Sequence, residues 1–156
     1  MGTDIHGIIE CRWDNWLDED DRSWFEAIDL DHLYNGRSYM AFGALFGVRD
    51  TTLFRPLAPD RGLPPDVTRD ARAAYEGWSV AHSGSWITWA ELKAADWDTI
   101  ALEETTWYDG NLDRIGRPTR RQAVRDEEWG PVWDVMLTLA RLHGDEGVRL
   151  VVWFDC

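Results

Sequence analysis

The first residues of the chain, MGTDIHGIIECRW, place acidic and imidazole side chains inside a short apolar run. In a β-strand alternate residues share a face, so Asp4, His6 and Glu10 are predicted to lie on one face together with Ile8. A carboxylate two residues from an imidazole can orient it as a general acid or base. Ile8 indicates that this face is covered, in which case its polar side chains need a protein group, a metal or a ligand as partner. The alternative is a strand with one face in water.

A second polar cluster occurs in HSGSW, which the sequence predicts to be a loop before a helix. His82 adds an imidazole to the candidate catalytic set, and Ser83 is a candidate ligand-binding hydroxyl. No G-x-S-x-G motif accompanies them, and bonding of the serine to backbone amides in a turn is the structural alternative. A zinc site needs three or four ligands, so a metal held by Asp4, His6 and His82 stays an open question, and no cofactor is predicted.

Three arginines, Arg37, Arg49 and Arg61, stand beside predicted helix ends or in a proline-rich loop. Such positions leave a side chain little freedom, which favours bidentate recognition of an anion such as phosphate. The alternative is pairing with some of the 29 acidic residues of the chain.

The apolar pattern predicts strands over residues 4–13 and 24–30, joined by an acidic turn. Helical spacing predicts a buried helix over 39–46 that ends at Gly47. Four of the six prolines fall in the segment RPLAPDRGLPPDVTRD, which excludes regular structure over most of it. A helix over 68–76 follows, and a capping box formed by Thr88 and Glu91 predicts another from residue 89.

The C-terminal part predicts an amphipathic helix from Pro131 to Gly144 and a strand over 148–155 that is apolar on both faces. No element is predicted between residues 103 and 128, which are polar and rich in turn formers. The order of elements predicts one compact α+β domain over residues 1–156. Its small, mostly antiparallel sheet is expected to include the N-terminal and C-terminal strands, packed by three to four short helices.

The net charge of −13 repels nucleic-acid backbones, so broad nucleic-acid binding is not expected. Neither a membrane-spanning apolar stretch nor a secretory signal is found, and the two cysteines form no redox or metal motif. We therefore expect a cytoplasmic protein without membrane attachment. Eleven tryptophans leave room for a binding surface.

The series GTDIHGIIE, NGRSYMAFGALFGVR, RGLPPDV, HSGSWITWAEL and VRLVVWFD resembles a family of small uncharacterised proteins common in bacteriophage and bacterial genomes. Many of its members begin Met-Gly-Cys-Asp-Ile-His. The resemblance runs in order over most of the chain and implies a phage or prophage setting without implying an activity. Thr3 replaces the usual cysteine, which argues against a metal-ligating thiol at this position.

Two functions are compatible with these patterns. The first is a polar pocket that binds a phosphate-bearing small molecule such as a nucleotide. If the protein is an enzyme, the same pocket hydrolyses that molecule. His6 would be its acid or base, Asp4 the orienting carboxylate and the arginines the anion clamp. The second is an acidic interaction module that inhibits a host enzyme or defence factor, with mimicry of nucleic acid as one form of it.

Overall fold

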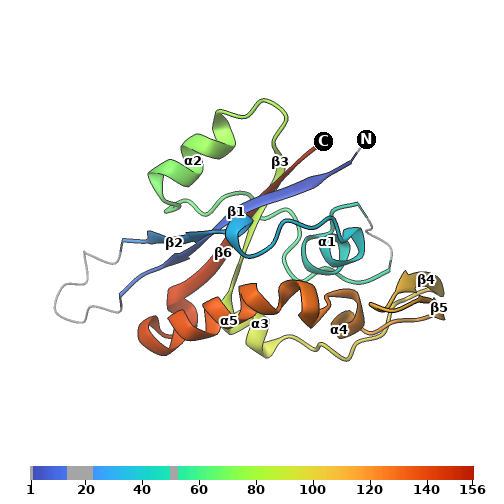
Figure 1. Ribbon diagram of the computed structural model, residues 1–156. Helices are drawn as coiled ribbons and strands as arrows, with labels where there is room; N and C mark the ends of the chain where they lie inside the picture. The colour runs from blue at the N-terminus through green and yellow to red at the C-terminus, as the bar shows by residue number, and fades with distance from the viewer. Residues whose placement is uncertain (1, 14–22, 50–52) are drawn as a thin grey trace.

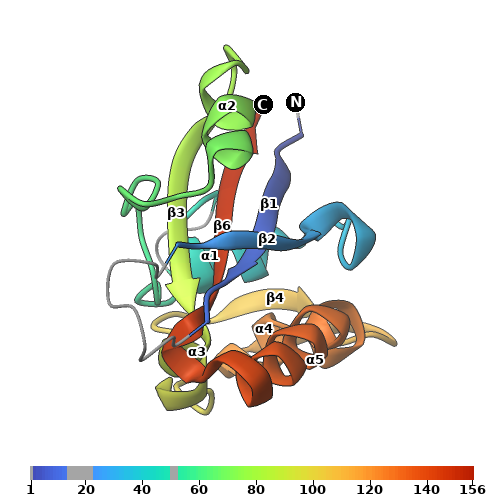
Figure 2. The ribbon, with the colours of Figure 1, turned by 90° about the vertical axis from the view of Figure 1, so that its left-hand side faces the viewer.

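The computed structural model describes residues 2–13, 23–49 and 53–156. Its centre is a four-stranded antiparallel sheet, seen face-on in Figure 2, with the strand order β2-β1-β6-β3. The strands are β1 (Asp4–Cys11), β2 (Phe25–Asp29), β3 (His82–Thr88) and β6 (Val148–Asp155). The N-terminal and C-terminal strands therefore pair directly, which confirms the prediction that they share a sheet. The acidic turn predicted between β1 and β2 lies outside the described residues.

The central position of β6 follows from its two apolar faces. Leu150, Val152 and Phe154 contribute to the main core, and Val151 contributes to a smaller core on the opposite face. β1 runs so close to β6 that a Cβ atom at Gly7 would collide with the Val151 carbonyl oxygen. Gly7 therefore permits the pairing of the two strands.

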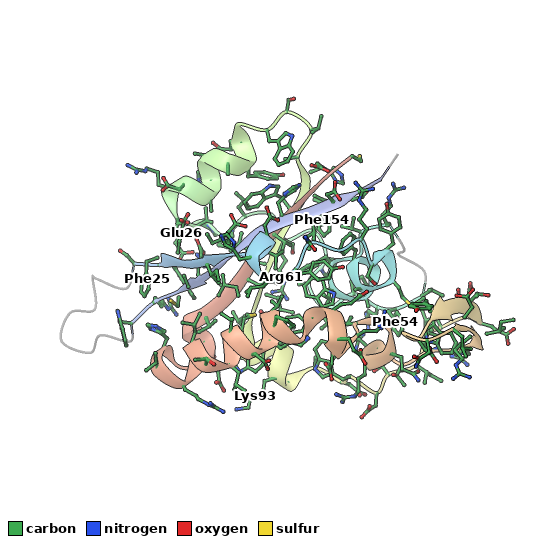
Figure 3. The ribbon with its side chains drawn as sticks, in the orientation of Figure 1. Phe25, Glu26, Phe54, Arg61, Lys93 and Phe154 are labelled. Atoms are coloured by element: carbon green, nitrogen blue, oxygen red, sulfur yellow. The ribbon has the colours of Figure 1, made fainter. Side chains whose placement is uncertain are left out.

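Helices cover both faces of this sheet (Figure 1). The main core packs α1 and α5 against one face, and side chains fill the space between them and the sheet (Figure 3). The shorter α2 covers part of the other face, where the smaller core lies. The five helices of the described chain are α1 (Tyr39–Phe46), α2 (Arg69–Glu76), α3 (Trp89–Ala94), α4 (Arg120–Ala123) and α5 (Asp126–His143). This architecture is the predicted α+β fold.

A second, two-stranded sheet occupies part of the region for which the sequence predicts no element. β4 (Thr105–Tyr108) and β5 (Asp113–Gly116) form an antiparallel hairpin at one end of the molecule, beside α4 (Figure 1). Pattern analysis misses the hairpin because each strand has only four residues, many of them polar. A strand of that length is too short to show a clear alternation of apolar and polar residues.

Two predicted elements differ from the structure. HSGSW is part of the strand β3, not a loop, because its backbone pairs with β6 and tertiary pairing overrides turn propensity. The last helix begins at Asp126, five residues before Pro131, and spans 18 residues, so it is not short. Its first turn carries three acidic residues, which the positive end of a helix dipole stabilises. Among the described helices, none combines the length and apolar character needed to cross a membrane.

Candidate functional site

The polar face of β1 is covered, as Ile8 indicates. Ile8 packs with Val67, Ala71 and Val151 in the smaller core. The side chains that share its face must therefore find partners inside the protein or at its margin. Each of the predicted site residues has found such a partner, and they fall into separate regions.

Glu10 is fully buried in an ionic network. Its Oε1 accepts a hydrogen bond from Arg149 Nε at 2.7 Å, and its Oε2 accepts one from the Thr68 backbone amide at 2.9 Å. Arg149 also donates to Asp66 Oδ1 at 2.8 Å and lies against the Trp24 ring. Burial opposes ionisation of Asp66, but the hydrogen bond and charge of Arg149 hold the pKa of Asp66 below its ordinary value. Glu10 thus ties the segment before α2 to the sheet.

His6 lies near the other end of β1 and contacts Asp155. Its Nε2 is 2.9 Å from Asp155 Oδ2, and its ring packs against Trp78 at a centroid distance of 4.5 Å. The His6 side chain is 20% exposed, so the pair sits at the margin of the covered face.

Asp4 and two of the predicted arginines come together at the start of β1. Arg37 donates from Nε and Nη2 to the two oxygens of Asp4, at 2.5 and 3.0 Å. This hydrogen bond and the arginine charge lower the pKa of Asp4. Arg49 donates to Thr3 Oγ1 at 2.8 Å and lies over the Tyr39 ring. Arg37 is thus paired with an acidic residue, which is the structural alternative to an anion clamp, and Arg49 lies beside this pair.

Arg61 lies in a different region and forms a two-point ion pair with Glu91. It also donates to the Trp86 carbonyl oxygen at 3.1 Å. The hydrogen bonds from Arg61 lower the pKa of Glu91. Arg61 holds the proline-rich loop against α3.

His82 and Ser83 do not meet His6. His82 pairs with Phe154 and His6 with Trp153, so the two imidazoles point to opposite faces of the sheet. His82 Nδ1 lies 2.9 Å from Ser83 Oγ. Within the described chain no group of three or more His, Cys, Asp or Glu side chains is arranged to hold a metal ion.

A groove of about 750 Å³ lies beside Arg149 and has tryptophan walls. Trp24 and Trp86 form these walls, and three of the charged lining residues, Asp66, Glu91 and Arg149, are engaged in ion pairs. Arg149 is shared by Glu10 and Asp66, and Glu91 is held by Arg61. Because these groups satisfy one another, we assign this network a structural role.

A second cavity, of about 430 Å³, also has paired arginines in its lining, Arg37 with Asp4 and Arg125 with Glu127 and Glu128. It differs from the groove in that buried polar atoms of its lining have no hydrogen-bond partner among the described residues. It lies between the first turn of α1, the β4–β5 hairpin, α4 and the start of α5, at the right-hand end of Figure 1. Its polar and aromatic lining residues are Arg37, Ser38, Tyr39, Thr106, Trp107, Tyr108, Gln122, Arg125 and Glu128. Of the predicted site residues, Arg37 reaches this cavity, and Asp4 fixes it there.

Local sequence signals build the walls of this cavity. Ser38 caps α1 by accepting a hydrogen bond from the Ala41 amide, so the start of that helix is fixed at the cavity. Thr119 and Gln122 form the capping box of α4. Gly110, with φ of 104°, turns the hairpin so closely over Arg125 that a Cβ atom would lie 2.8 Å from its Nη2.

Arg125 is one of the cavity residues that sequence analysis missed. Its side chain is 18% exposed and lies over the Tyr108 ring, with the guanidinium carbon 5.4 Å from the ring centroid. It contacts Glu128 at 3.4 Å. Its buried Nε has no hydrogen-bond partner within the described chain, and the same holds for Trp107 Nε1 and Glu128 Oε2. The T-x-x-Q capping signal of residues 119–122 could have predicted a helix start just before Arg125. It could not have predicted that the Arg125 side chain faces the hairpin.

The arrangement suits an anion. Ser38, Tyr39 and Met40 at the start of α1 line the cavity together with Arg37 and Arg125, so the positive end of the helix dipole lies near two guanidinium groups. Comparison of the chain with protein-family models, with curated proteins and with solved structures finds no match.

Proposed function

We propose that this protein binds a phosphate-bearing small molecule of mononucleotide size in the cavity between α1 and the β4–β5 hairpin. The observation that carries the proposal is that Arg37, Arg125 and the first turn of α1 line one cavity. The lining carries two arginines and one acidic residue, Glu128, in a chain of net charge −13, and guanidinium groups are well suited to phosphate.

Hydroxyl groups add donors to this site. Ser38 Oγ accepts from the Ala41 amide, and Tyr39 Oη accepts from the Thr3 amide at 3.0 Å. Because both oxygens act as acceptors, their own O–H groups are left to donate. A phosphate oxygen is a suitable acceptor for such donors.

The size and aromatic lining support a ligand larger than phosphate alone. A volume of about 430 Å³ falls within the range of small-molecule pockets. Tyr108, 53% exposed, offers a ring on which a planar group can stack. A nucleotide combines a phosphate with such a group.

We propose binding rather than hydrolysis for this site. The His6–Asp155 pair lies on the sheet, and neither residue lines the cavity. A phosphate-transfer reaction needs a group placed on the attacking nucleophile. Incubation with nucleotides should therefore give a complex and no new product, and product formation abolished by His6→Ala would contradict this.

Titration calorimetry with ribose 5-phosphate and nucleoside monophosphates tests the site. Arg37→Gln and Arg125→Gln should each weaken binding by about tenfold to a hundredfold, the value of a charge-assisted hydrogen bond. Arg69→Gln is the matched control, because that side chain is 94% exposed. Gly110→Ala should displace Arg125 and weaken binding without touching the ligand. Unchanged affinity in both arginine variants would exclude the site.

A second candidate function is protein interaction through the segment 100–116. Ile100, Leu102, Leu112 and Ile115 are between 48% and 76% exposed, which is unusual for apolar side chains within one short segment. Ile115→Asp should abolish capture of a host protein, whereas Leu137→Asp on α5 should not. Loss of capture at high salt would favour the acidic-mimic form of this hypothesis.

A further inference from the structure

Two cavity-lining side chains are not explained by a phosphate group, namely Gln122 and Glu128. A carboxylate beside the arginines repels phosphate, so Glu128 must face a different part of any ligand. Its Oε1 contacts Arg125 Nη1 at 3.4 Å, while its Oε2 is buried without a hydrogen-bond partner among the described residues. This oxygen is therefore an unused acceptor.

Gln122 provides the complementary donors. Its Oε1 accepts a hydrogen bond from the Thr119 amide at 2.9 Å within the capping box of α4. The box fixes which end of the amide faces Thr119, so the NH₂ group points away from the box and carries two donors. The lining thus contains a donor group and a carboxylate whose second oxygen is unpaired but turned away from solvent.

A nucleobase with two adjacent N–H donors beside a carbonyl oxygen matches this pair. Guanine carries N1–H and N2–H₂ next to O6, and a carboxylate accepts from both nitrogens at once. Adenine presents an unprotonated N1 at the corresponding place, which a carboxylate repels. Tyr108, held against Arg125, supplies a ring for stacking of the base.

We infer that the cavity is selective for a guanine nucleotide, with Glu128 accepting from N1–H and N2–H₂ and Gln122 donating to O6. This inference rests on the proposed phosphate site at Arg37 and α1. Since Glu128 Oε2 is shielded in the structure, its carboxylate must rotate on binding, and a side chain that is 36% exposed has freedom to do so.

Calorimetric titration with GMP, AMP and ribose 5-phosphate separates base recognition from phosphate recognition. GMP should bind about tenfold or more tightly than AMP, as expected for a good bidentate base contact. Glu128→Gln should remove this preference without weakening ribose 5-phosphate, because it takes a negative charge away from Arg125. Gln122→Glu keeps the acceptor of the capping box but removes the donors, so it should weaken GMP more than ribose 5-phosphate, which responds only to the added negative charge.

The outcomes distinguish the two proposals. Equal affinities for GMP and AMP, or tighter binding of AMP, would overturn guanine selectivity while leaving the phosphate site intact. Absence of binding by all three probes would overturn both. If Glu128→Gln fails to fold, as thermal melting will show, a GMP affinity unchanged by Gln122→Glu overturns the inference by itself.

Discussion

At the scale of single residues, the surroundings of each charged group decide its role more than its position in a pattern. Glu10 and Asp4 share one face of β1, yet Glu10 is fully buried against Arg149, whereas Asp4 is at the surface with Arg37. The buried Glu10 is a structural counterion of Arg149. The exposed Asp4 positions the Arg37 guanidinium beside a cavity.

Replacing Glu10 should be strongly destabilising. Glu10→Met leaves Arg149, itself 3% exposed, with one of its two carboxylate partners, and breaking a buried pair costs about 3–5 kcal/mol. We expect a loss near the lower end, about 3 kcal/mol, because Asp66 remains as a partner. Urea denaturation measures the free energy of unfolding. The double variant Glu10→Met, Arg149→Met should be more stable than Glu10→Met alone, and a larger loss would refute the counterion role.

The two cysteines should react very differently. Cys11 is buried, and this burial, followed by the charge of Glu10, raises its pKa to about 11. Cys156 is exposed. Because the thiolate is the reactive form, a disulfide reagent at pH 8 should label one thiol in the folded protein and two after denaturation. Cys156→Ser should abolish the fast reaction, and persistence of fast labelling would contradict the burial of Cys11.

At the scale of elements, capping boxes and ion pairs fix where the short helices begin. Thr88 and Glu91 start α3, Thr119 and Gln122 start α4, and each box satisfies amides at its helix N-terminus. α4 spans four residues, too few to be stable alone, so its place at the cavity depends on this cap and on tertiary packing.

Glu91 should link the stability of α3 to pH. The Arg61 hydrogen bond lowers its folded-state pKa below the ordinary value of 4.5. A lowered pKa stabilises the fold above the unfolded-state value, and this contribution is lost as the pH falls through the folded-state value. Glu91→Gln keeps the capping box but removes the charge. It should cost about 0.5–1 kcal/mol at pH 7, and the difference from wild type should shrink below pH about 4.5.

The same denaturation series on Asp70→Asn provides the control. Asp70 is 71% exposed and pairs with an almost fully exposed arginine, so the variant should match wild type at each pH. A Glu91 effect that persisted unchanged at low pH would show that the ion pair with Arg61 does not contribute.

At the scale of the whole molecule, one sheet separates two unlike faces. The main core, with α1 and α5, supplies most of the buried apolar side chains. The opposite face carries a small core, an ionic network and the His6–Asp155 pair. The candidate cavity lies beyond the sheet, where helix termini and the hairpin meet.

The net charge should make folding and ligand binding respond to salt in opposite directions. Self-repulsion of a chain with net charge −13 destabilises the compact state, and salt screens it. Raising NaCl from about 20 mM to about 200 mM should therefore raise the Tm. The same change should weaken phosphate binding to Arg37 and Arg125. A phosphate affinity insensitive to salt would argue against recognition by charge.

The amino-acid sequence by itself determined the elements whose signals are local. Alternating apolar residues defined β1, and a run apolar on both faces defined β6. Gly47 and Gly144 marked two helix ends, and the Thr88–Glu91 spacing located α3. Such signals depend on residues within about one helical turn or along a single strand, so they can be read from neighbours alone.

Only the tertiary structure decided which charged groups meet. Glu10 finds Arg149 across 139 positions of the chain, and Asp4 finds Arg37 across 33. With 29 acids and 16 bases available, spacing does not select one pair among so many, because pairing depends on how strands and loops pack. The sequence singled out Arg37 as a candidate residue, whereas its place with Arg125 in the lining of one cavity depends on how α1, α5 and the hairpin pack.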